Sequence, residues 1–262
     1  MTIRPRRLFR RLFVRLFANS RRRLFAVALG IVAGIGAAHP ALTALNVTNL
    51  SGFMAGGSGA TVTFTASAVD SVDRSTYTYT SQSIGTEAAD RIVVVAVTYT
   101  TTASISSVTI NLVSATQVVA ATGSGGQKIE LWKASVPTGT SVTIIVVHPG
   151  TSDRGSIGVW AVYGASSTTY DTGSKTAADP LSDTVNIPTG GVVIAAAANN
   201  DAGTDTYTWT GLDENYDALV EDPTDHSGAS RAFESAETGY TVTANESSAS
   251  TAGALVIGVW GP

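Results

Sequence analysis

Residues 60–262 consist largely of short segments rich in β-branched residues, and turn-forming residues lie between these segments. Eleven such segments occur, from TVTFTAS at 61–67 to ALVIGVWG at 254–261. Valine, isoleucine, threonine and aromatic residues favour extended backbone, and no helical apolar period runs through this part of the chain. Many short strands at fairly regular spacing are typical of a sandwich or barrel. We therefore expect an all-β fold, an antiparallel, jelly-roll-like β-sandwich.

The segments differ in how their apolar residues are arranged. TYTYTSQS at 76–83 alternates aromatic and hydroxyl residues, whereas IVVVAV at 92–97 and VVIAAAA at 192–198 are apolar throughout. Alternation is typical of a strand with one face in solvent. Uninterrupted apolar runs are typical of strands that are buried on both faces or central in a packed sandwich.

An equal spacing suggests an internal repeat. Val93 precedes Trp160 by 67 residues, and Val193 precedes Trp260 by the same number. Both tryptophans lie in apolar segments, so we expect them in the core. The spacing is consistent with two related halves, and equally with chance in two segments of low complexity.

The charge of the chain is divided unevenly. Nine of the 16 basic residues precede Ala26, and the first acidic residue is Asp70. The part after Phe25 carries seven basic and 20 acidic side chains. Such asymmetry indicates a tail whose role differs from that of the body. The chain contains no cysteine, which excludes disulfides and thiolate metal sites.

The basic tail begins with an amphipathic pattern. Leucine–phenylalanine pairs recur every four residues from Leu8 to Phe17. On a helix these pairs occupy one side and four arginines the other. The four are Arg7, Arg10, Arg11 and Arg15. A basic helix with an apolar face suits a membrane surface or a groove in another protein better than it suits nucleic acid.

A second pattern follows at residues 20–34, SRRRLFAVALGIVAG. It resembles a twin-arginine export signal, in which Ser20 and the Arg21-Arg22 pair precede a mildly apolar segment. The uncharged run 24–38 has 15 residues, fewer than the roughly 20 that span a bilayer. Three interpretations stay open: a cleaved export signal, an anchor or membrane-surface helix within residues 6–38, and an arm that docks the protein onto a particle.

Composition changes at NVTNLSGFMAGGSG, a glycine-rich hinge at 46–59. The hinge separates a helical and signal-like segment at 1–45 from a single large β-sandwich at 60–262. If the repeat is real, the two related halves of the sandwich are about 60–165 and 166–262.

Catalytic side chains do not form a recognisable set in the sequence. The three histidines, His39, His148 and His226, lie far apart, and His148 in VVHPG is expected in a turn at a strand end. A nucleophile, a base and an orienting group cannot be assembled from these positions. We therefore expect a non-enzymatic protein that needs no cofactor, with Ca²⁺ as the one ion to consider.

Two groups of residues are candidates for binding. Acidic residues gather in NNDAGTD and LDENYDALVEDPTDHSG, which we expect to be loops, and oxygen-rich loops can hold Ca²⁺. The candidate ligands are Asp201, Asp205, Asp213, Asp217, Asp222 and Asp225. Tyr207 and Trp209 in TYTWTG alternate with threonine, and as an exposed pair they could contact a ligand such as a glycan.

The order of features over residues 76–165 resembles a β-sandwich module of bacteriophage tail, fibre and head-decoration proteins. The shared features are a polar alternating strand, a turn of the form G-x-x-x-x-x-R from Gly85 to Arg91, the hairpin VPTGT at 136–140 and a strand containing Trp160. The resemblance implies a structural module without catalytic residues.

Together these observations predict a structural or attachment protein on a virion surface, of the spike, fibre or decoration type. Its expected partners are other virion proteins, further copies of itself, or a host-surface glycan. The alternative is an exported bacterial protein of lectin or adhesin type, periplasmic, extracellular or anchored to a membrane.

Overall fold

The computed structural model describes residues 59–101, 104–200, 206–221, 224–247 and 253–262. Within these ranges the regular elements are β-strands, apart from one 3-10 turn at Ser124–Gly126. No helix in the same ranges is long and apolar enough to cross a membrane. Every strand pair is antiparallel. The expectation of an all-β, antiparallel fold is confirmed.

The first eight strands lie within residues 61–163, which we call the first half. They are β1 (Thr61–Asp70), β2 (Arg74–Ser83), β3 (Ile92–Thr100), β4 (Ser107–Ile110), β5 (Val113–Ser114), β6 (Thr116–Thr122), β7 (Gln127–Ser135) and β8 (Ser141–Tyr163). The last eight lie within residues 169–260, the second half. They are β9 (Thr169–Ala177), β10 (Leu181–Ile187), β11 (Val192–Asn199), β12 (Tyr207–Thr210), β13 (Asp213–Glu221), β14 (Thr224–Ala232), β15 (Glu237–Glu246) and β16 (Gly253–Trp260).

The two halves follow the same path. In each half five strands form an inner sheet, in the order β1-β8-β3-β7-β6 in the first and β9-β16-β11-β14-β13 in the second. The outer sheets also correspond, because β2 and β4 flank β8 as β10 and β12 flank β15. Strand β8 belongs to both sheets of its half: residues 141–152 pair in the outer sheet and 153–163 in the inner one. In the second half β15 and β16 take these two positions as separate strands.

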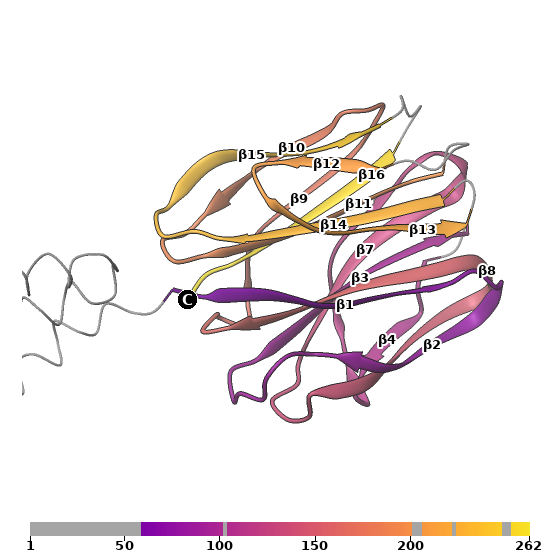
Figure 1. The fold of residues 1–262 in the computed structure, drawn as a ribbon, viewed down its shortest axis with the longest axis horizontal. Coiled ribbons are helices and arrows are strands. Elements are labelled where there is room, and N and C mark those ends of the chain that lie inside the picture. The colour runs from indigo at the N-terminus through magenta and orange to yellow at the C-terminus, as the bar shows by residue number, and fades with distance from the viewer. Residues whose placement is uncertain (1–58, 102–103, 201–205, 222–223, 248–252) are drawn as a thin grey trace, which may run out of the picture. The chain divides into compact units, whose positions relative to one another are not determined.

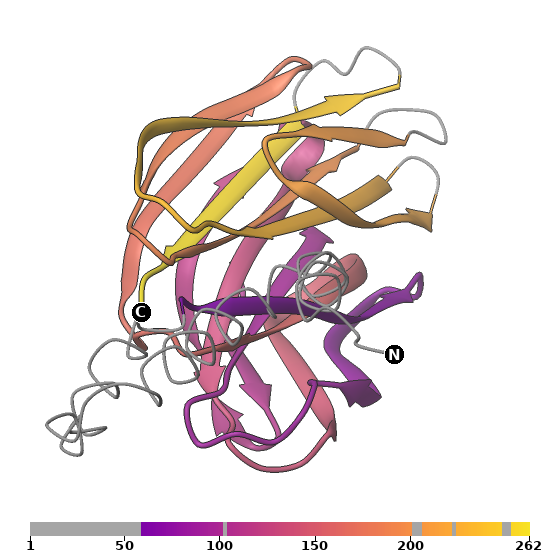
Figure 2. The ribbon, with the colours of Figure 1, turned by 60° about the vertical axis from the view of Figure 1, so that its left-hand side comes forward.

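The sheets are layered so that the two inner sheets face each other. Three apolar clusters fill the spaces, one inside each half and one between the halves. Figures 1 and 2 show the strands of the second half, in orange and yellow, stacked on those of the first. The three central strands of each inner sheet are therefore largely buried on both faces, whereas the edge strands β1, β6, β9 and β13 also carry exposed side chains.

This layering explains the two continuous apolar runs. In β3, Val93 and Val95 point into the core of the first half, while Val94 points into the cluster between the halves. In β11, Val193 and Ile194 divide in the same way between the core of the second half and the shared cluster. The interpretation of these runs as strands buried on both faces is confirmed.

The tryptophans predicted to be in the core are there, since Trp160 and Trp260 are fully buried. Their equal distances from Val93 and Val193 do not reflect an equal register, however. Val94 lies opposite Trp160, whereas Val192 lies opposite Trp260. The pairing of the two halves is thus offset by two residues at this point, although the strand order is the same.

His148 does not lie in a turn as the sequence analysis expects. Strand β8 continues through VVHPGTSDRG, and the His148 ring is buried against the rings of Tyr77 and Tyr99, with centroids 5.7 and 4.7 Å away. Burial and the charge of Lys128 lower the pKa of His148 to about 4. The turn-like residues bend β8 from the outer to the inner sheet, where Arg154 adopts a φ of 54°.

The acidic stretch from Leu212 to Gly228 is also not a loop. Its described residues form the hairpin of β13 and β14. In β13, Tyr216 and Val220 are buried, while Asp213 and Asp217 are exposed. The alternation of a half-buried strand is present in the sequence, but the acidic residues conceal it.

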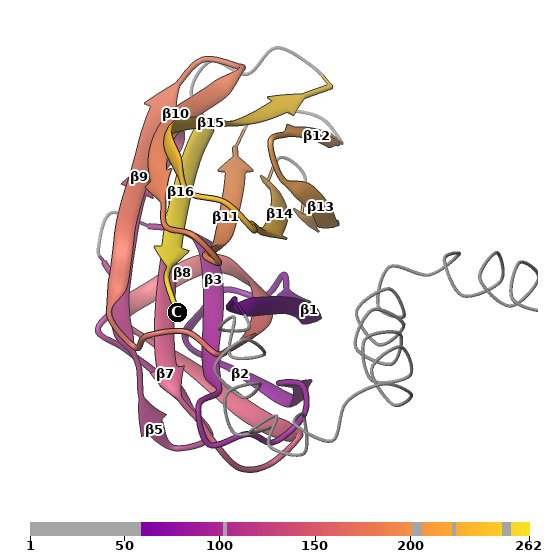
Figure 3. The same ribbon diagram turned by 90° about the vertical axis from the view of Figure 1, so that its left-hand side faces the viewer.

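Two opposite ends of the body are distinguished by where the chain enters it: the near end, where residues 59–60 and Pro262 lie, and the far end, where β8 bends. At the near end Ala60 N–H donates to Gly190 O (2.7 Å), and Ser166 N–H donates to Gly261 O (2.7 Å). Figure 3 views the body from this side. At the far end Arg154 donates to Thr224 Oγ1 (3.3 Å). The point where the chain enters the body and Pro262 therefore lie together, opposite the bend of β8 (Figure 1).

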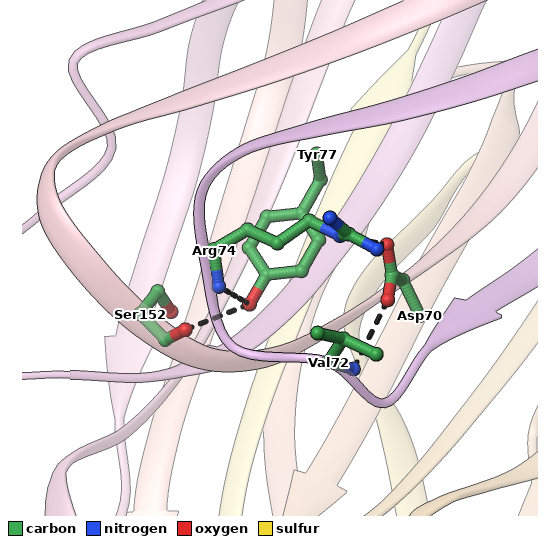
Figure 4. A network of polar contacts seen from close by, with 5 residues as sticks. All are labelled: Asp70, Val72, Arg74, Tyr77 and Ser152. Atoms are coloured by element: carbon green, nitrogen blue, oxygen red, sulfur yellow. Dashed lines mark hydrogen bonds and ion pairs between the residues drawn. The ribbon is translucent and has the colours of Figure 1, made fainter.

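A polar network holds the first half together at the far end (Figure 4). Tyr77 O–H donates to Ser152 O in the bend of β8 (2.8 Å) and accepts from Arg74 N–H (3.3 Å). Asp70 pairs with the Arg74 side chain at 2.7 Å and accepts from Val72 N–H at 3.0 Å. The turn between β1 and β2 is thus fastened to the bend of β8.

Several sequence predictions fall outside the described residues. They are the helix and signal-like segment at 1–45 with Arg7, Arg10, Arg11, Arg15, Ser20, Arg21 and Arg22, nearly all of the hinge at 46–59, and Asp201, Asp205 and Asp222.

Candidate functional site

A buried histidine links the two halves. His226 on β14 lies with its Nδ1 against Ser156 Oγ of β8, and its Nε2 is 2.8 Å from Tyr216 O–H of β13. Burial lowers the pKa of His226 to about 3, so the ring is neutral near pH 7. A neutral imidazole has one donor and one acceptor nitrogen, which two hydroxyl groups can satisfy.

Ser156 and His226 are 70 residues apart, so no local sequence pattern indicates this pair. Ser156 and His226 are both fully buried. A nucleophile must reach its substrate, and these groups do not reach the surface. Their arrangement therefore joins the halves by hydrogen bonds across an otherwise apolar layer.

Small residues make room for the aromatic part of this link. A Cβ atom on Gly158 would lie 2.3 Å from Tyr216 O–H, and one on Gly228 would lie 2.8 Å from the Trp160 ring. Phe64 of β1 stacks on Tyr216 with ring centroids 5.1 Å apart. Glycine in the two inner strands is thus required for close approach of the halves.

Each half also buries a tyrosine–glutamate pair. In the first half Tyr99 O–H donates to Glu130, which also accepts from Gln117 (2.6 Å) and Trp132 (2.9 Å). In the second half Tyr207 O–H donates to Glu246 Oε1 at 2.9 Å. Burial raises the pKa of Tyr99 and of Tyr207, so both are neutral donors to carboxylates. These bonds are charge-assisted and contribute to structure.

Tyr207 and Trp209 are not the exposed pair that the sequence analysis expects. They are 3% and 9% exposed and belong to the core of the second half. Trp209 Nε1–H donates to Ser227 Oγ at 2.8 Å. The alternation in TYTWTG is real, but the aromatic residues point inward and the threonines outward.

The described acidic candidates do not converge. Asp213 and Asp217 are exposed on β13, and Asp217 Oδ2 accepts Tyr207 N–H at 2.9 Å. Asp225 is buried on β14. Among the residues that the structure describes, no group of three or more acidic or histidine side chains is placed to hold a metal ion. A Ca²⁺ site that also uses Asp201, Asp205 and Asp222 stays a prediction.

A polar hollow opens on the side of the second half, close to the near end of the body. Its volume is about 370 Å³, and it lies between the start of β9, the end of β10 and the start of β15. The side chains that line it include Tyr170, Asp171, Asn186, Ile187, Glu237 and Thr238. Tyr170 is 58% exposed, among the most exposed of the described aromatic residues. No sequence pattern indicates this group, because its members lie on or beside three strands.

The floor of this hollow is ordered by hydrogen bonds. Asp171 accepts Thr172 N–H through Oδ1 (2.8 Å) and Asn186 N–H through Oδ2 (2.7 Å). Asn186 Oδ1 in turn accepts Gly239 N–H at 3.1 Å. Three strands from two sheets are thereby connected, and the polar groups are held in place before any ligand arrives.

A smaller hollow, of about 190 Å³, lies on the first half beside Lys133. Lys133 Nζ donates to Ser167 O (2.6 Å) and Thr169 Oγ1 (2.7 Å), and burial lowers its pKa. Because these bonds tie Lys133 to the connection between the halves, we assign it a structural role.

Comparison of the chain with protein-family models, with curated proteins and with solved structures finds no match. Function must therefore be argued from the geometry above, and the resemblance to a phage module stays an expectation.

Proposed function

We propose that this chain is a non-enzymatic structural or attachment protein of a virion surface, of the spike, fibre or decoration type. Its partners are other virion proteins or further copies of the chain, and a host-surface glycan in its attachment role. Residues 1–45 dock the body onto the particle.

The proposal depends on where the chain enters the body from its N-terminal side. Residue Gly59 lies beside Gly190 at the near end, where a Cβ on Gly59 would be 2.8 Å from the Gly190 Cα. Inner strands β3 and β11 both run from this end to the far end. A body attached at one end presents its far end and its flanks outward, as an attachment protein requires.

The strand order supports the same class of protein. If β8 counts as the seventh and eighth strands and the two-residue β5 is not counted, each half has strands one, eight, three, six and five in one sheet and two, seven and four in the other. We take this order to be that of a jelly roll, an architecture found in viral capsid and lectin domains. The two halves would then be two jelly rolls packed through their inner sheets.

The chemistry of the described residues also favours a non-enzymatic role. The one serine–histidine pair that they contain, Ser156 and His226, is closed off between the inner sheets. The excess of acidic over basic side chains in the body favours solubility at high local density.

The proposal is tested by deleting residues 1–45, which leaves the compact unit Gly57–Pro262 intact. Full-length and truncated chains are produced during infection, and purified particles are probed by immunoblotting. We expect the full-length chain in the particles and the truncated chain only in the supernatant. Equal incorporation of both would exclude docking by the tail, and absence of both would exclude a virion role.

The alternative is an exported lectin or adhesin, which the twin-arginine-like residues 20–34 favour. The mass of the N-terminal peptide of the protein isolated from its native source distinguishes the two. A mature chain that starts between His39 and Leu45 supports export, whereas an intact Met1 excludes cleavage.

A further inference from the structure

We propose that the hollow beside Tyr170 binds a neutral pyranose sugar. The inference deepens the attachment role proposed above and rests on it for its biological use. Binding itself depends only on the side chains of the second half.

The aromatic side chain of the hollow is placed there by a β-bulge. Along β16, Val259 lies opposite Asp171 and Trp260 lies opposite Thr169, so Tyr170 is the extra residue on β9. A bulge changes the direction of a side chain relative to the regular pleat. The Tyr170 ring therefore stands largely in solvent beside the hollow. Such a ring offers an apolar face to the C–H groups of a sugar and a hydroxyl group at its edge.

The polar groups of the hollow match hydroxyl groups, which both donate and accept. Each Asp171 oxygen accepts one backbone N–H and retains a second lone pair. The Asn186 amide uses its oxygen on Gly239 and turns its two N–H donors to solvent, because Asn186 is exposed. Glu237 and Thr238 add an exposed carboxylate and an exposed hydroxyl group.

Charge selects among sugars. The lining contains the carboxylates of Asp171 and Glu237, and none of its residues is lysine, arginine or histidine. An acidic sugar or a phosphate would be repelled by these carboxylates. The hydroxyl groups of a neutral sugar can donate hydrogen bonds to these carboxylates without such a penalty. The volume of about 370 Å³ is near the lower end of the range for small-ligand sites, about 300–1,000 Å³.

The matching corner of the first half is occupied by a longer connection. There Glu87 accepts Gly139 N–H at 2.6 Å, as Asn186 accepts Gly239 N–H in the second half. The connection 84–91 fills the corner in the first half and buries Ile84 and Arg91 completely. The matching connection, 188–191, is half as long and leaves the corner open.

The test is saturation-transfer NMR on the full-length chain with methyl glycosides of glucose, galactose and mannose. N-acetylneuraminic acid and glucosamine serve as anionic and cationic probes. We expect at least one neutral glycoside to bind in the millimolar range and the anionic probe not to bind. Tyr170→Ala should weaken the binding about tenfold or more, whereas Tyr170→Phe, which keeps the ring, should retain most of it.

Matched variants locate the effect in the hollow. Glu237→Gln should weaken binding severalfold, while Glu214→Gln and Leu219→Ala, which replace exposed residues of β13, should leave it unchanged. All these residues are exposed, so thermal melting should show that the variants are folded. The proposal is overturned if no neutral glycoside binds, if Tyr170→Ala binds as the wild type does, or if only glucosamine binds. Particle incorporation of the Tyr170→Ala chain is measured in parallel, because its loss would concern the docking role and not the sugar site.

Discussion

The two halves of the body share one strand order and differ most at their corners. In the first half Arg91 donates to the carbonyl oxygens of Gly85, Thr86, Val136, Thr138 and Gly139 at 2.7–3.0 Å. In the second half a glycine, Gly191, precedes the matching strand, and its carbonyl accepts Phe233 N–H as that of Arg91 accepts Val136 N–H. The same corner is thus a sealed polar core in one half and an open hollow in the other.

This difference shows which parts of the body are constrained by the fold and which parts are free to form a binding site. The inner sheets share their strand order, and the central strands of both must bury two faces. The connections face solvent and are free to differ in length and chemistry. A function that resides in only one half must therefore be sought in the connections, and the hollow beside Tyr170 is one such place.

The largest effect is expected at the sealed corner. Arg91→Met removes five hydrogen bonds, one of them buried and four partly buried, and leaves the Val136 carbonyl group buried without this donor, which should lower the free energy of unfolding by about 3 kcal/mol. Urea denaturation measures the change. Arg74→Met is the matched control: its pair with Asp70 is half-exposed and should contribute less than about 1 kcal/mol. Similar small losses for both variants would show that Arg91 does not hold the corner closed.

The next effect concerns the link between the halves. The pKa of His226 falls from 6.5 in the unfolded chain to about 3 in the folded one, so the unfolded chain binds the extra proton between these values. The contribution of His226 to the free energy of unfolding should be fully present above pH 6.5. It should fall on acidification, by at most about 1.4 kcal/mol per pH unit. Urea titrations between pH 7 and pH 3 measure the slope.

Other groups titrate in the same range, and variants separate them. His226→Gln should reduce the slope of the free energy of unfolding against pH, between pH 6.5 and 3, by up to about 1.4 kcal/mol per pH unit, which corresponds to one proton. His148→Gln should do so over the narrower interval down to about 4, because burial lowers the pKa of His148 less. If His226→Gln leaves the slope unchanged, the junction of the halves is not the acid-sensitive part.

The smallest effects are expected at a pair of matching turns. Between β12 and β13, Gly211 has a φ of 94°, and a Cβ atom there would lie 2.7 Å from Thr241 O. Between β4 and β5, Leu112 has a φ of 65° with its side chain 88% exposed. Gly211→Ala should destabilise the protein by more than about 1 kcal/mol. Leu112→Gly should stabilise it by about 0.5 kcal/mol, because glycine adopts positive φ without strain.

Thermal melting of the two variants gives the comparison. Changes of the same sign would mean that the turns are not equivalent in backbone strain, despite their matching places in the strand order.

Much of the fold could be predicted from short-range patterns. The β-branched segments predicted most strands, and the runs at 92–97 and 192–198 predicted strands with two buried faces. The strands β13 and β14 were missed because acidic residues obscured their alternation. His148 was misplaced because Pro149 and Gly150 are typical of turns, whereas here they bend a strand that continues.

The candidate site was largely beyond sequence reasoning. Tyr207 and Trp209 alternate with threonine, but the alternation does not say which set faces the core. Arg91 was noticed in the turn that begins at Gly85, and VPTGT was noticed separately, yet only the structure shows that the guanidinium group joins them. Tyr170, Asn186 and Glu237 lie on three strands and have no common sequence signal.

The sequence by itself determined the all-β class and which strands lie deepest, because these follow from side-chain chemistry repeated at a period of two residues. The tertiary structure alone decided that the strand order occurs twice, that the inner sheets pack face to face around His226, and that one corner is sealed while its counterpart is open. These features depend on contacts between residues tens of positions apart, and a local pattern does not specify which distant segments meet.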